Sequence, residues 1–264
     1  MTLPLALLAA LGAPGGAGAA TAAMVEGVAE PDAATGTTGS VDLSFANATG
    51  NTENLTLILG GKLEVDRGPV EHAFQTGARY AESAPRGTDD RQQTQEAVFA
   101  SYQLDADLSD RLFAFGRVRY DYDAFSGFDH RVFTGAGLGY RFAETEAVNW
   151  TVSGGPGVRW TRLAAPDVPP DAPDPDFERE QTEFSTYASS DLDWDVTETV
   201  SFEQDARVTY TDTSTTLEAE AALKSKLTEN LSARFSYRVQ HETDPPEGRQ
   251  PTDTLMTAGL AYGF

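Results

Sequence analysis

Apolar and polar residues alternate along much of the chain, beginning near residue 39. The stretch NLSARFSYRVQ at 230–240 shows the pattern. Its odd-numbered positions hold Leu, Ala, Phe, Tyr and Val, and the even-numbered positions that follow Asn230 hold Ser, Arg, Ser, Arg and Gln. Successive side chains of a β-strand point to opposite faces, so a period of two indicates strands with one apolar and one polar face. Helical periodicity is almost absent after residue 39.

Twelve segments follow this pattern, and each has about ten residues or slightly more, the length of a tilted strand that crosses a bilayer. They lie at 39–47, 54–65, 70–81, 93–105, 111–122, 130–142, 148–162, 182–196, 199–210, 215–227, 230–241 and 253–264. The sequence therefore predicts an all-β protein with about twelve strands, each connected to the next along the chain.

The connections between these segments alternate in length. Short ones lie at 66–69, 107–110, 144–147, 197–198 and 229–230. Generally longer ones lie at 48–53, 82–92, 123–129, 163–181, 211–214 and 242–252. Short turns at one end and longer loops at the other are typical of bacterial outer-membrane barrels. An even number of strands places both ends of the barrel on the short-turn side, which we expect to be periplasmic.

A soluble barrel or sandwich also alternates, so two further features of the pattern matter. The apolar face stays free of charge through the strand middles, and its aromatic residues gather at the strand ends in two groups, as in the girdles of membrane barrels. One group is Tyr102, Tyr140, Trp150, Trp194 and Tyr262, and the other is Tyr80, Tyr122, Trp160 and Tyr210. Twelve strands are also too many for a small soluble barrel to fill with side chains. We therefore expect residues 39–264 to form a closed antiparallel transmembrane β-barrel with meander topology, in the outer membrane of a Gram-negative bacterium.

The first 38 residues lack this alternation. Residues 1–20 are apolar and small, and AGAA at 17–20 resembles a signal-peptidase site, although the first basic residue is Lys62. We interpret 1–20 as a signal peptide; a disordered Ala/Gly tail is the alternative. Residues 21–38 are small and polar and are expected to be a short disordered lead-in.

Composition excludes several classes of function. The chain carries 41 acidic and 19 basic residues, a net charge of −22, which argues against a nucleic-acid partner. It contains no cysteine, so disulfides and thiolate zinc sites are excluded. The acidic, proline-rich 163–181 segment lacks the spacing of an EF-hand, so we expect neither a metal site nor a cofactor.

Four stretches together resemble a known family. They are GNT at 50–52, FSGFDHRVFTGAGLGY at 125–140, GGPGVRW at 154–160 and the closing GLAYGF at 259–264. In their order and spacing they resemble the salt-induced outer-membrane protein family, which is defined by a domain of unknown function. The resemblance covers about residues 39–264 and implies an outer-membrane barrel with no established activity.

The polar face is expected to line the lumen with charge. On the C-terminal strands opposite charges fall on neighbouring segments, a pattern that stabilises by about 0.2–1 kcal/mol per pair. These are Glu203 and Asp205 beside Lys224 and Lys226, and Glu218 and Glu220 beside Arg234 and Arg238. We therefore expect this side of the lumen to be a satisfied ladder.

The rest of the lumen divides by charge. We predict a basic wall of Arg117, Arg119, Arg131 and Arg159, facing an acidic wall of Asp191, Asp193, Asp195, Glu203 and Asp205. Walls of opposite sign would create a transverse field that selects among small charged solutes. The alternative is a network of salt bridges that only stiffens the barrel.

Structural roles are expected for two further features of the inward face. Phe99, Phe113, Phe115 and Phe133 fall beside Gly135, Gly137 and Gly139, and rings that lie over glycines would fix strand register and partly fill the lumen. Pro156 lies mid-strand, where it cannot donate a ladder hydrogen bond, so we predict a bulge there.

These features favour a narrow diffusion channel or a structural envelope protein linked to osmotic or salt conditions. A receptor or adhesion protein acting through the 163–181 loop is an alternative. A hydrolase built on Ser126, Asp129 and His130 is disfavoured because an acid and a base adjacent in sequence make a poor triad, so we predict no enzyme. The expected partners are outer-membrane lipid and lipopolysaccharide, the barrel-assembly machinery and small charged solutes.

The last strand carries an additional signal. Its lipid-facing positions are predicted to include Met256, Leu260, Tyr262 and the terminal aromatic Phe264. This ending resembles the signal that barrel-assembly machinery recognises in its substrates. The same strand is expected to close the barrel against SVDLSF at 40–45.

Overall fold

The structure is a computed structural model that describes residues 36–48, 52–85, 90–164, 179–245 and 250–264. The predicted signal peptide, most of the predicted lead-in and most of the 163–181 loop lie outside these residues. The described residues form twelve strands. They are β1 Thr37–Ala48, β2 Thr52–Asp66, β3 Val70–Pro85, β4 Gln92–Asp107, β5 Leu112–Asp123, β6 Phe128–Glu144, β7 Val148–Leu163, β8 Glu180–Asp195, β9 Val200–Thr211, β10 Thr215–Lys226, β11 Leu231–Glu242 and β12 Thr252–Gly263.

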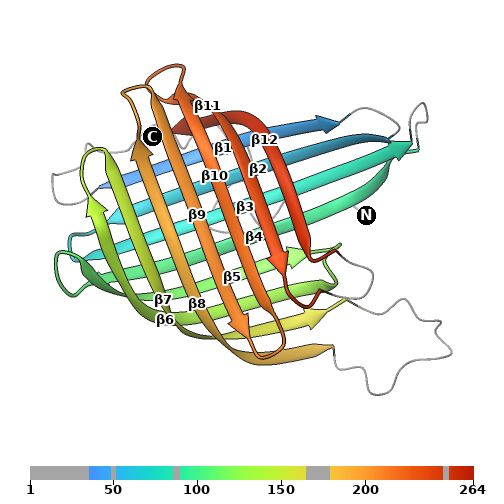
Figure 1. Cartoon of the computed structure of the whole chain (residues 1–264), viewed down its shortest axis with the longest axis horizontal. Coiled ribbons are helices and arrows are strands. Elements are labelled where there is room, and N and C mark those ends of the chain that lie inside the picture. Colours follow the sequence, from blue (N-terminus) through green and yellow to red (C-terminus); the bar gives the residue numbers. More distant parts are fainter. Residues whose placement is uncertain (1–35, 49–51, 86–89, 165–178, 246–249) are drawn as a thin grey trace, which may run out of the picture. The chain divides into compact units, whose positions relative to one another are not determined.

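Each strand pairs antiparallel with its neighbours in the chain, and β12 pairs with β1 to close the barrel (Figure 1). At this seam Val41 lies opposite Tyr262, and the backbones of Gly39 and Phe264 exchange two hydrogen bonds of 2.9 Å. A closed barrel satisfies the backbone of every strand within the sheet, which a lipid environment requires. The predicted fold, including the pairing of SVDLSF with the last strand, is confirmed.

The connections sort onto the two ends of the barrel as expected. β1 begins and β12 ends at the short-turn end, where the amide of Asp66 donates to the carbonyl of Gly36 and the amide of Gly263 to that of Asn230. Gly68, in the turn after β2, has a φ of 75°, a conformation that glycine adopts without strain. β1 starts at Thr37, slightly before the predicted boundary.

Large apolar side chains cover the outside of the barrel. Leu43 of β1, Phe184 of β8 and Met256 of β12 are 52%, 66% and 59% exposed. At the short-turn end the rings of Tyr140, Phe142 and Trp150 contact one another on the outside, as expected of an aromatic girdle. None of the described segments is a helix long and apolar enough to cross a membrane. An apolar outer wall around a polar interior is the arrangement of a membrane barrel.

Aromatic rings lie over two of the three predicted glycines on the inside of β6, Gly135 and Gly139, whereas Phe99 lies over Gly77 of β3. A Cβ atom added to Gly139 would lie 2.0 Å from the ring of Phe113, and one on Gly135 would lie 2.6 Å from the ring of Phe133. Phe113, Phe115 and Phe133 form a buried cluster together with Tyr187 of β8. This aromatic cluster fills one side of the lumen.

The bulge predicted at Pro156 is absent. Pro156 pairs with Thr186 of β8, and the register between β6 and β7 is the same on both sides of it. Two residues of β6, Ala136 and Gly137, have no paired partner on β7, so the ladder skips these pairs and inserts no extra residue. The backbones of the two strands approach closely here: a Cβ atom on Gly137 would lie 2.1 Å from the carbonyl oxygen of Gly154. The register shifts of the sheet occur elsewhere, between Ala81 and Glu82, between Phe128 and His130, and between Arg141 and Ala143.

Candidate functional site: the barrel lumen

The barrel encloses a polar cavity of about 630 Å³, and residues from all twelve strands line it. Eleven Lys or Arg and thirteen Asp or Glu side chains are among its lining residues. The lumen is therefore close to balanced in charge, although the chain as a whole carries −22. Its chemistry depends on where these charges lie and on which are paired.

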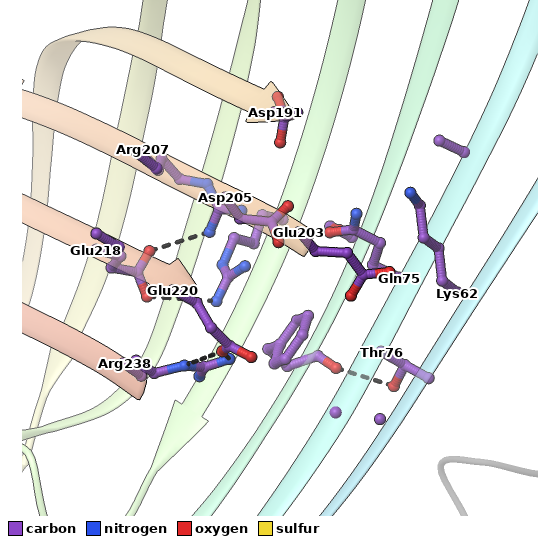
Figure 2. Close-up of a pocket in the computed structure, with 18 of the residues that line it drawn as sticks. Lys62, Gln75, Thr76, Asp191, Glu203, Asp205, Arg207, Glu218, Glu220 and Arg238 are labelled. Atoms are coloured by element: carbon purple, nitrogen blue, oxygen red, sulfur yellow. Dashed lines mark hydrogen bonds and ion pairs between the residues drawn. The ribbon is translucent and has the colours of Figure 1, made fainter. Parts of the chain in front are cut away.

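The predicted charge ladder on β9–β11 is present in part. Glu203 of β9 pairs with Lys224 of β10, and Glu220 of β10 accepts from both Arg234, at 2.6 Å, and Arg238, at 2.5 Å. Figure 2 shows Glu203, Glu220 and Arg238 on this wall. Glu203 and Glu220 therefore have cations on the neighbouring strand, as predicted, whereas Asp205 lies opposite another carboxylate, Asp191.

Glu218 departs from the predicted ladder. It lies on β10, but its partners are Arg207 of β9, at 3.0 Å, and Arg119 of β5, at 3.9 Å, where the arginines of β11 were expected. Arg119 in turn holds both carboxylate oxygens of Asp121 on its own strand. Glu218 therefore connects two sides of the lumen.

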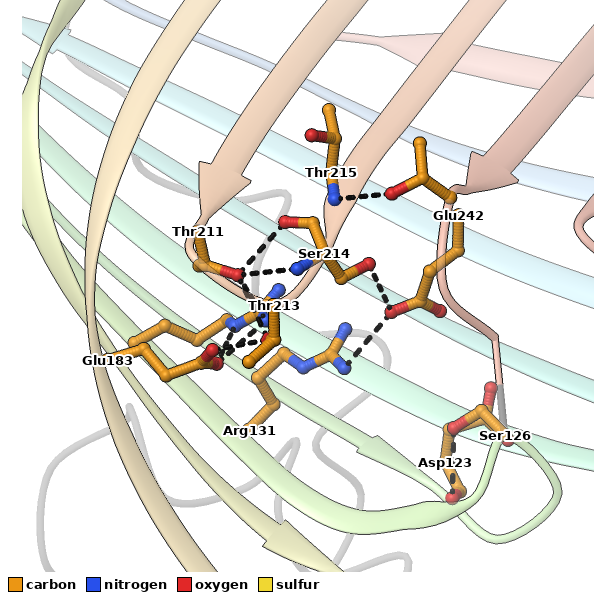
Figure 3. Close-up of polar contacts among 11 residues, drawn as sticks. Asp123, Ser126, Arg131, Glu183, Thr211, Thr213, Ser214, Thr215 and Glu242 are labelled. Atoms are coloured by element: carbon orange, nitrogen blue, oxygen red, sulfur yellow. Dashed lines mark hydrogen bonds and ion pairs between the residues drawn. The ribbon is translucent and has the colours of Figure 1, made fainter. Parts of the chain in front are cut away.

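Three arginines of the predicted basic wall are paired with carboxylates. Arg119 contacts Asp121, and Arg159 of β7 contacts Glu183 of β8 at 2.8 Å. Arg131 of β6 lies 3.7 Å from Glu242 of β11, as Figure 3 shows, and its guanidinium lies over the ring of Phe128.

Arg117 is the fourth arginine of this wall, and its surroundings are different. It is only 8% exposed, and its hydrogen bonds go to neutral groups, the hydroxyl of Tyr187 at 2.5 Å and the side chain of Gln103 at 3.3 Å. Its guanidinium also lies against the Tyr187 ring, 5.2 Å from the centroid. Sequence reasoning did not single out Tyr187, although alternation within β8 places it on the inward face with Glu183 and Ser189.

The predicted acidic residues lie on β8 and β9 and bring like charges together. Asp191 is opposite Asp205, and Asp193 is opposite Glu203. Asp195 is exposed at the short-turn end of β8 and lines a smaller, separate cavity of about 110 Å³. Carboxylates that face each other repel, so this patch keeps a negative potential toward the lumen.

The two walls adjoin and do not face each other across the barrel. β8 follows β7 directly, and Arg159 of the basic wall is in register with Glu183 beside the acidic one. Opposite β5 and β6 lie β10 and β11, which carry Glu218 and Glu242. A field of the predicted kind would therefore run between neighbouring sectors of the lumen.

The residues considered for a hydrolase are bound to other partners. His130 shares a hydrogen bond of 2.9 Å with the hydroxyl of Tyr120, and Asp129 pairs with Arg179. The hydroxyl of Ser126 donates to the backbone carbonyl of Asp123. Within the described residues, no cluster of three or more His, Asp or Glu side chains is arranged to hold a metal ion.

The sequence profile of one family, described as a protein of unknown function, DUF481, matches residues 41–264. The chain belongs to the DUF481 family. This is the salt-induced outer-membrane protein family that the four sequence stretches resemble, and the match spans the barrel from β1 to the terminal aromatic residue. No curated protein has a significantly similar sequence.

Several solved structures are similar to this DUF481 barrel. The NanC porin is 8% identical, with 85% of this chain and 97% of the porin covered at a TM-score of 0.46. The COG4313 outer membrane channel from Pseudomonas putida F1 is 10% identical, with 90% and 100% covered at 0.47. The translocator domain of the autotransporter NalP from Neisseria meningitidis is 9% identical, with 89% of each chain covered at 0.46. At identities this low, the similarity is one of general barrel architecture alone.

Proposed function

We propose that this DUF481 barrel is a narrow diffusion channel of the outer membrane for small charged solutes. The observation that carries the proposal is the reach of the polar cavity. Glu64 and Arg141 near the short turns line the same cavity as Asp123 and Ser126 near the longer loops. A polar space that extends between the two ends of a membrane barrel is what passive diffusion requires.

The arrangement of lumen charge supports a preference for charged solutes. Arginines of β5–β7 adjoin the carboxylates of β8 and β9. On these two neighbouring strands Asp191 lies beside Asp205 and Asp193 beside Glu203, which keeps a negative potential in the short-turn half of the lumen. Rings of charged side chains that line a pore discriminate among ions by sign. Neighbouring sectors of opposite sign would also orient dipolar solutes.

The placement of the barrel in the cell is part of the same proposal. The short-turn end, where β1 starts and β12 ends, would face the periplasm, as is usual for bacterial barrels with an even number of strands. Met256, Leu260, Tyr262 and Phe264 are 59%, 49%, 41% and 52% exposed on the outside of the barrel. This orientation supports their proposed role as the signal read by the barrel-assembly machinery. The link to salt or osmotic conditions is likewise proposed, from the family resemblance.

A second candidate is a structural barrel whose lumen is bridged by ion pairs. Two observations favour it: Arg119 contacts Glu218, and Arg131 contacts Glu242, in each case from opposite sides of the barrel. Such contacts stiffen the wall and obstruct the passage. Binding or adhesion through the 163–181 loop remains a separate hypothesis that falls largely outside the described residues.

Conductance in planar bilayers separates the channel from the structural barrel. The channel predicts stable, ion-selective current steps whose selectivity shifts toward cations in Arg117→Glu, with Arg117→Gln as the milder change if charge reversal prevents folding. Arg111→Glu, in the exposed turn between β4 and β5, makes the same charge change outside the lumen and should leave the current unaltered. A folded barrel that is silent in every variant would contradict the channel.

A further inference from the structure

Two ion pairs cross the lumen of this barrel. Arg119 of β5 reaches Glu218 of β10 with 3.9 Å between nitrogen and oxygen, and Arg131 of β6 reaches Glu242 of β11 with 3.7 Å. In each case four strands separate the partners around one side of the barrel and six around the other. The partners therefore approach each other through the interior, from nearly opposite walls.

Other ion pairs beside the cavity run along the barrel wall. Lys224–Glu203, Arg238–Glu220 and Arg159–Glu183 each join neighbouring strands. Arg119–Asp121 and Lys62–Glu64 join residues two apart on one strand. Such pairs leave the centre of the lumen open, whereas the two crossing pairs stand in the path of a solute.

The Arg119–Glu218 bridge is anchored at both ends. On β5 the guanidinium of Arg119 binds Asp121 and lies over the ring of Phe99, 4.4 Å from its centroid. On β10 the carboxylate of Glu218 accepts a hydrogen bond of 3.0 Å from Arg207, as Figure 2 shows. Both side chains are therefore held in position to meet in the lumen.

We propose that the Arg119–Glu218 bridge is the selectivity-determining constriction of the pore, an inference that rests on the proposed channel function. Its nitrogen–oxygen distance of 3.9 Å is longer than that of a hydrogen-bonded ion pair, and the two side chains are 13% and 30% exposed. Ion pairs in contact with water contribute little net stability, so this one opens thermally.

The chemistry of the bridge defines the solutes that pass. A carboxylate or another small oxyanion can replace Glu218 on the guanidiniums of Arg119 and Arg207, and a small cation can replace those guanidiniums on Glu218. A neutral solute of the same size offers neither exchange. The constriction therefore favours compact charged solutes, and those that carry both signs can satisfy both partners at once.

Three substitutions separate the geometry of the bridge from its charge. Glu218→Asp keeps the charge but shortens the side chain, so the bridge is lost and single-channel conductance rises by about twofold or more with little change in ion preference. Glu218→Gln raises conductance and shifts the preference toward anions, because Arg119 and Arg207 lose a carboxylate. Arg119→Gln also raises conductance but shifts the preference toward cations.

Glu203→Gln is the matched control. It removes the same charge from a wall pair with Lys224 and leaves the bridge intact, so it should shift ion preference without raising conductance. Folding of every variant is checked by heat-modifiable migration in SDS gels. Glu218→Asp and Glu218→Gln are close in shape to glutamate, so at least one is expected to fold.

Salt provides an independent measurement on the unaltered chain. The screening length falls from about 10 Å at 0.1 M salt to about 3 Å at 1 M, which loosens a pair that stands in water. Conductance of the unaltered barrel should therefore rise more steeply than the conductivity of the bulk solution, whereas that of Glu218→Gln should follow the bulk.

The outcomes distinguish the bridge from the channel. If the unaltered barrel conducts and the position-218 and position-119 variants conduct equally, the bridge is overturned and the channel stands. If the unaltered barrel and all variants are folded and silent, both are overturned. If only the variants conduct, the bridge is supported as a closure and the constitutive channel is contradicted.

Discussion

The strands β5–β8 and β9–β11 line the same lumen with different chemistry. On β5–β8 the inward side chains include a buried aromatic cluster of Phe113, Phe115, Phe133 and Tyr187, with the rings of Phe113 and Phe133 over glycines of the next strand. On β9–β11 the inward face is a chain of charges in which Glu203, Glu218 and Glu220 each contact an arginine or lysine on a neighbouring strand. Both regions line the open space, but the first packs aromatic rings among its charged residues, whereas the second is lined mainly by charge.

This difference separates what holds the barrel together from what acts on a solute. Packing of rings against glycine depends on shape and is insensitive to salt, whereas ion pairs next to water weaken as salt rises. The aromatic side should therefore dominate stability at every ionic strength. The charged side should respond to its surroundings, which is what a permeation path requires.

The largest expected effect on folding is at the point where the backbones of β6 and β7 approach most closely. A Cβ atom on Gly155 would lie 2.2 Å from the carbonyl oxygen of Ala136 and 2.6 Å from the Cα atom of Gly137, and moving these backbone atoms would disturb their pairing with β5. Gly155→Ala should therefore fail to reach the heat-modifiable folded form when refolded into lipid vesicles.

Gly116→Ala, on β5, is the control for this prediction. A Cβ atom at Gly116 meets nothing within 4 Å, so the same addition should leave folding unchanged. Normal folding of Gly155→Ala would show that β6 and β7 can separate at this point, and the packed side would then be less rigid than the structure indicates.

Tyr187→Ala should produce the next largest effect. Tyr187 is 2% exposed, contacts Phe115 and Phe133, and accepts the hydrogen bond of the buried Arg117. Removing the ring should lower the free energy of unfolding by about 3–5 kcal/mol. Tyr187→Phe keeps the ring and should lower it by about 1–3 kcal/mol, because Arg117 loses its best acceptor.

Urea titration of the barrel in detergent micelles measures both changes in the free energy of unfolding. If the aromatic side is held by packing, both changes should be independent of salt. If the cost of Tyr187→Ala fell substantially between 0.1 M and 1 M salt, the cation beside the ring would be the main contributor. The packing interpretation of the β5–β8 side would then be contradicted.

The fold is predictable from this sequence because a period of two is a local property. The twelve segments match the strands to within a few residues at most ends, since each strand must alternate to place apolar residues in lipid and polar residues inside. The pairing at the seam can also be predicted, because an even number of sequentially paired strands leaves β12 antiparallel to β1. The Pro156 bulge was a wrong prediction because glycines on both strands allow the ladder to skip two pairs.

The candidate site is less predictable because it depends on contacts between side chains from distant strands across the lumen. Neighbouring-strand pairs such as Arg238–Glu220 follow from registers that can be counted along the sequence. The contact of Arg119 with Glu218 does not, because it depends on the curvature of the wall and on the length of an arginine side chain. Tyr187 carried a signal, its inward position, but alternation alone does not tell which inward residues meet.

On the charged side, Glu220→Gln should have a smaller and salt-dependent effect. Glu220 is the shared acceptor of Arg234 and Arg238, and its loss leaves two guanidiniums beside each other. The free energy of unfolding should fall by about 1 kcal/mol at low salt, because these side chains are partly exposed. The difference should shrink toward zero at 1 M salt as the pairs are screened.

Glu146→Gln, in the exposed turn between β6 and β7, makes the same change outside the lumen and should be neutral at both salt concentrations. A cost for Glu220→Gln that persisted at 1 M salt would show that the ladder is held by hydrogen bonds shielded from water. The contrast between the two sides of the lumen would then be weaker than proposed.

The smallest effect on the folded barrel is expected from Phe264→Ala, which removes a ring that lies over a glycine on the outside of the barrel and keeps the two backbone hydrogen bonds with Gly39. A Cβ atom on Gly39 would lie 2.6 Å from the Phe264 ring, much as at Gly135, but Phe264 is 52% exposed and outside the buried cluster. Because little of the ring is buried, its removal should change the free energy of unfolding by less than about 1 kcal/mol. Insertion into the outer membrane of growing cells should nevertheless fall several-fold if the terminal aromatic residue is the assembly signal, whereas removal of the Tyr187 ring acts first on stability. Two measurements distinguish an assembly role of Phe264 from a packing role: the amount of folded barrel in membrane fractions, and the urea stability of the barrel in micelles. Equal losses in both measurements would assign Phe264 a packing role.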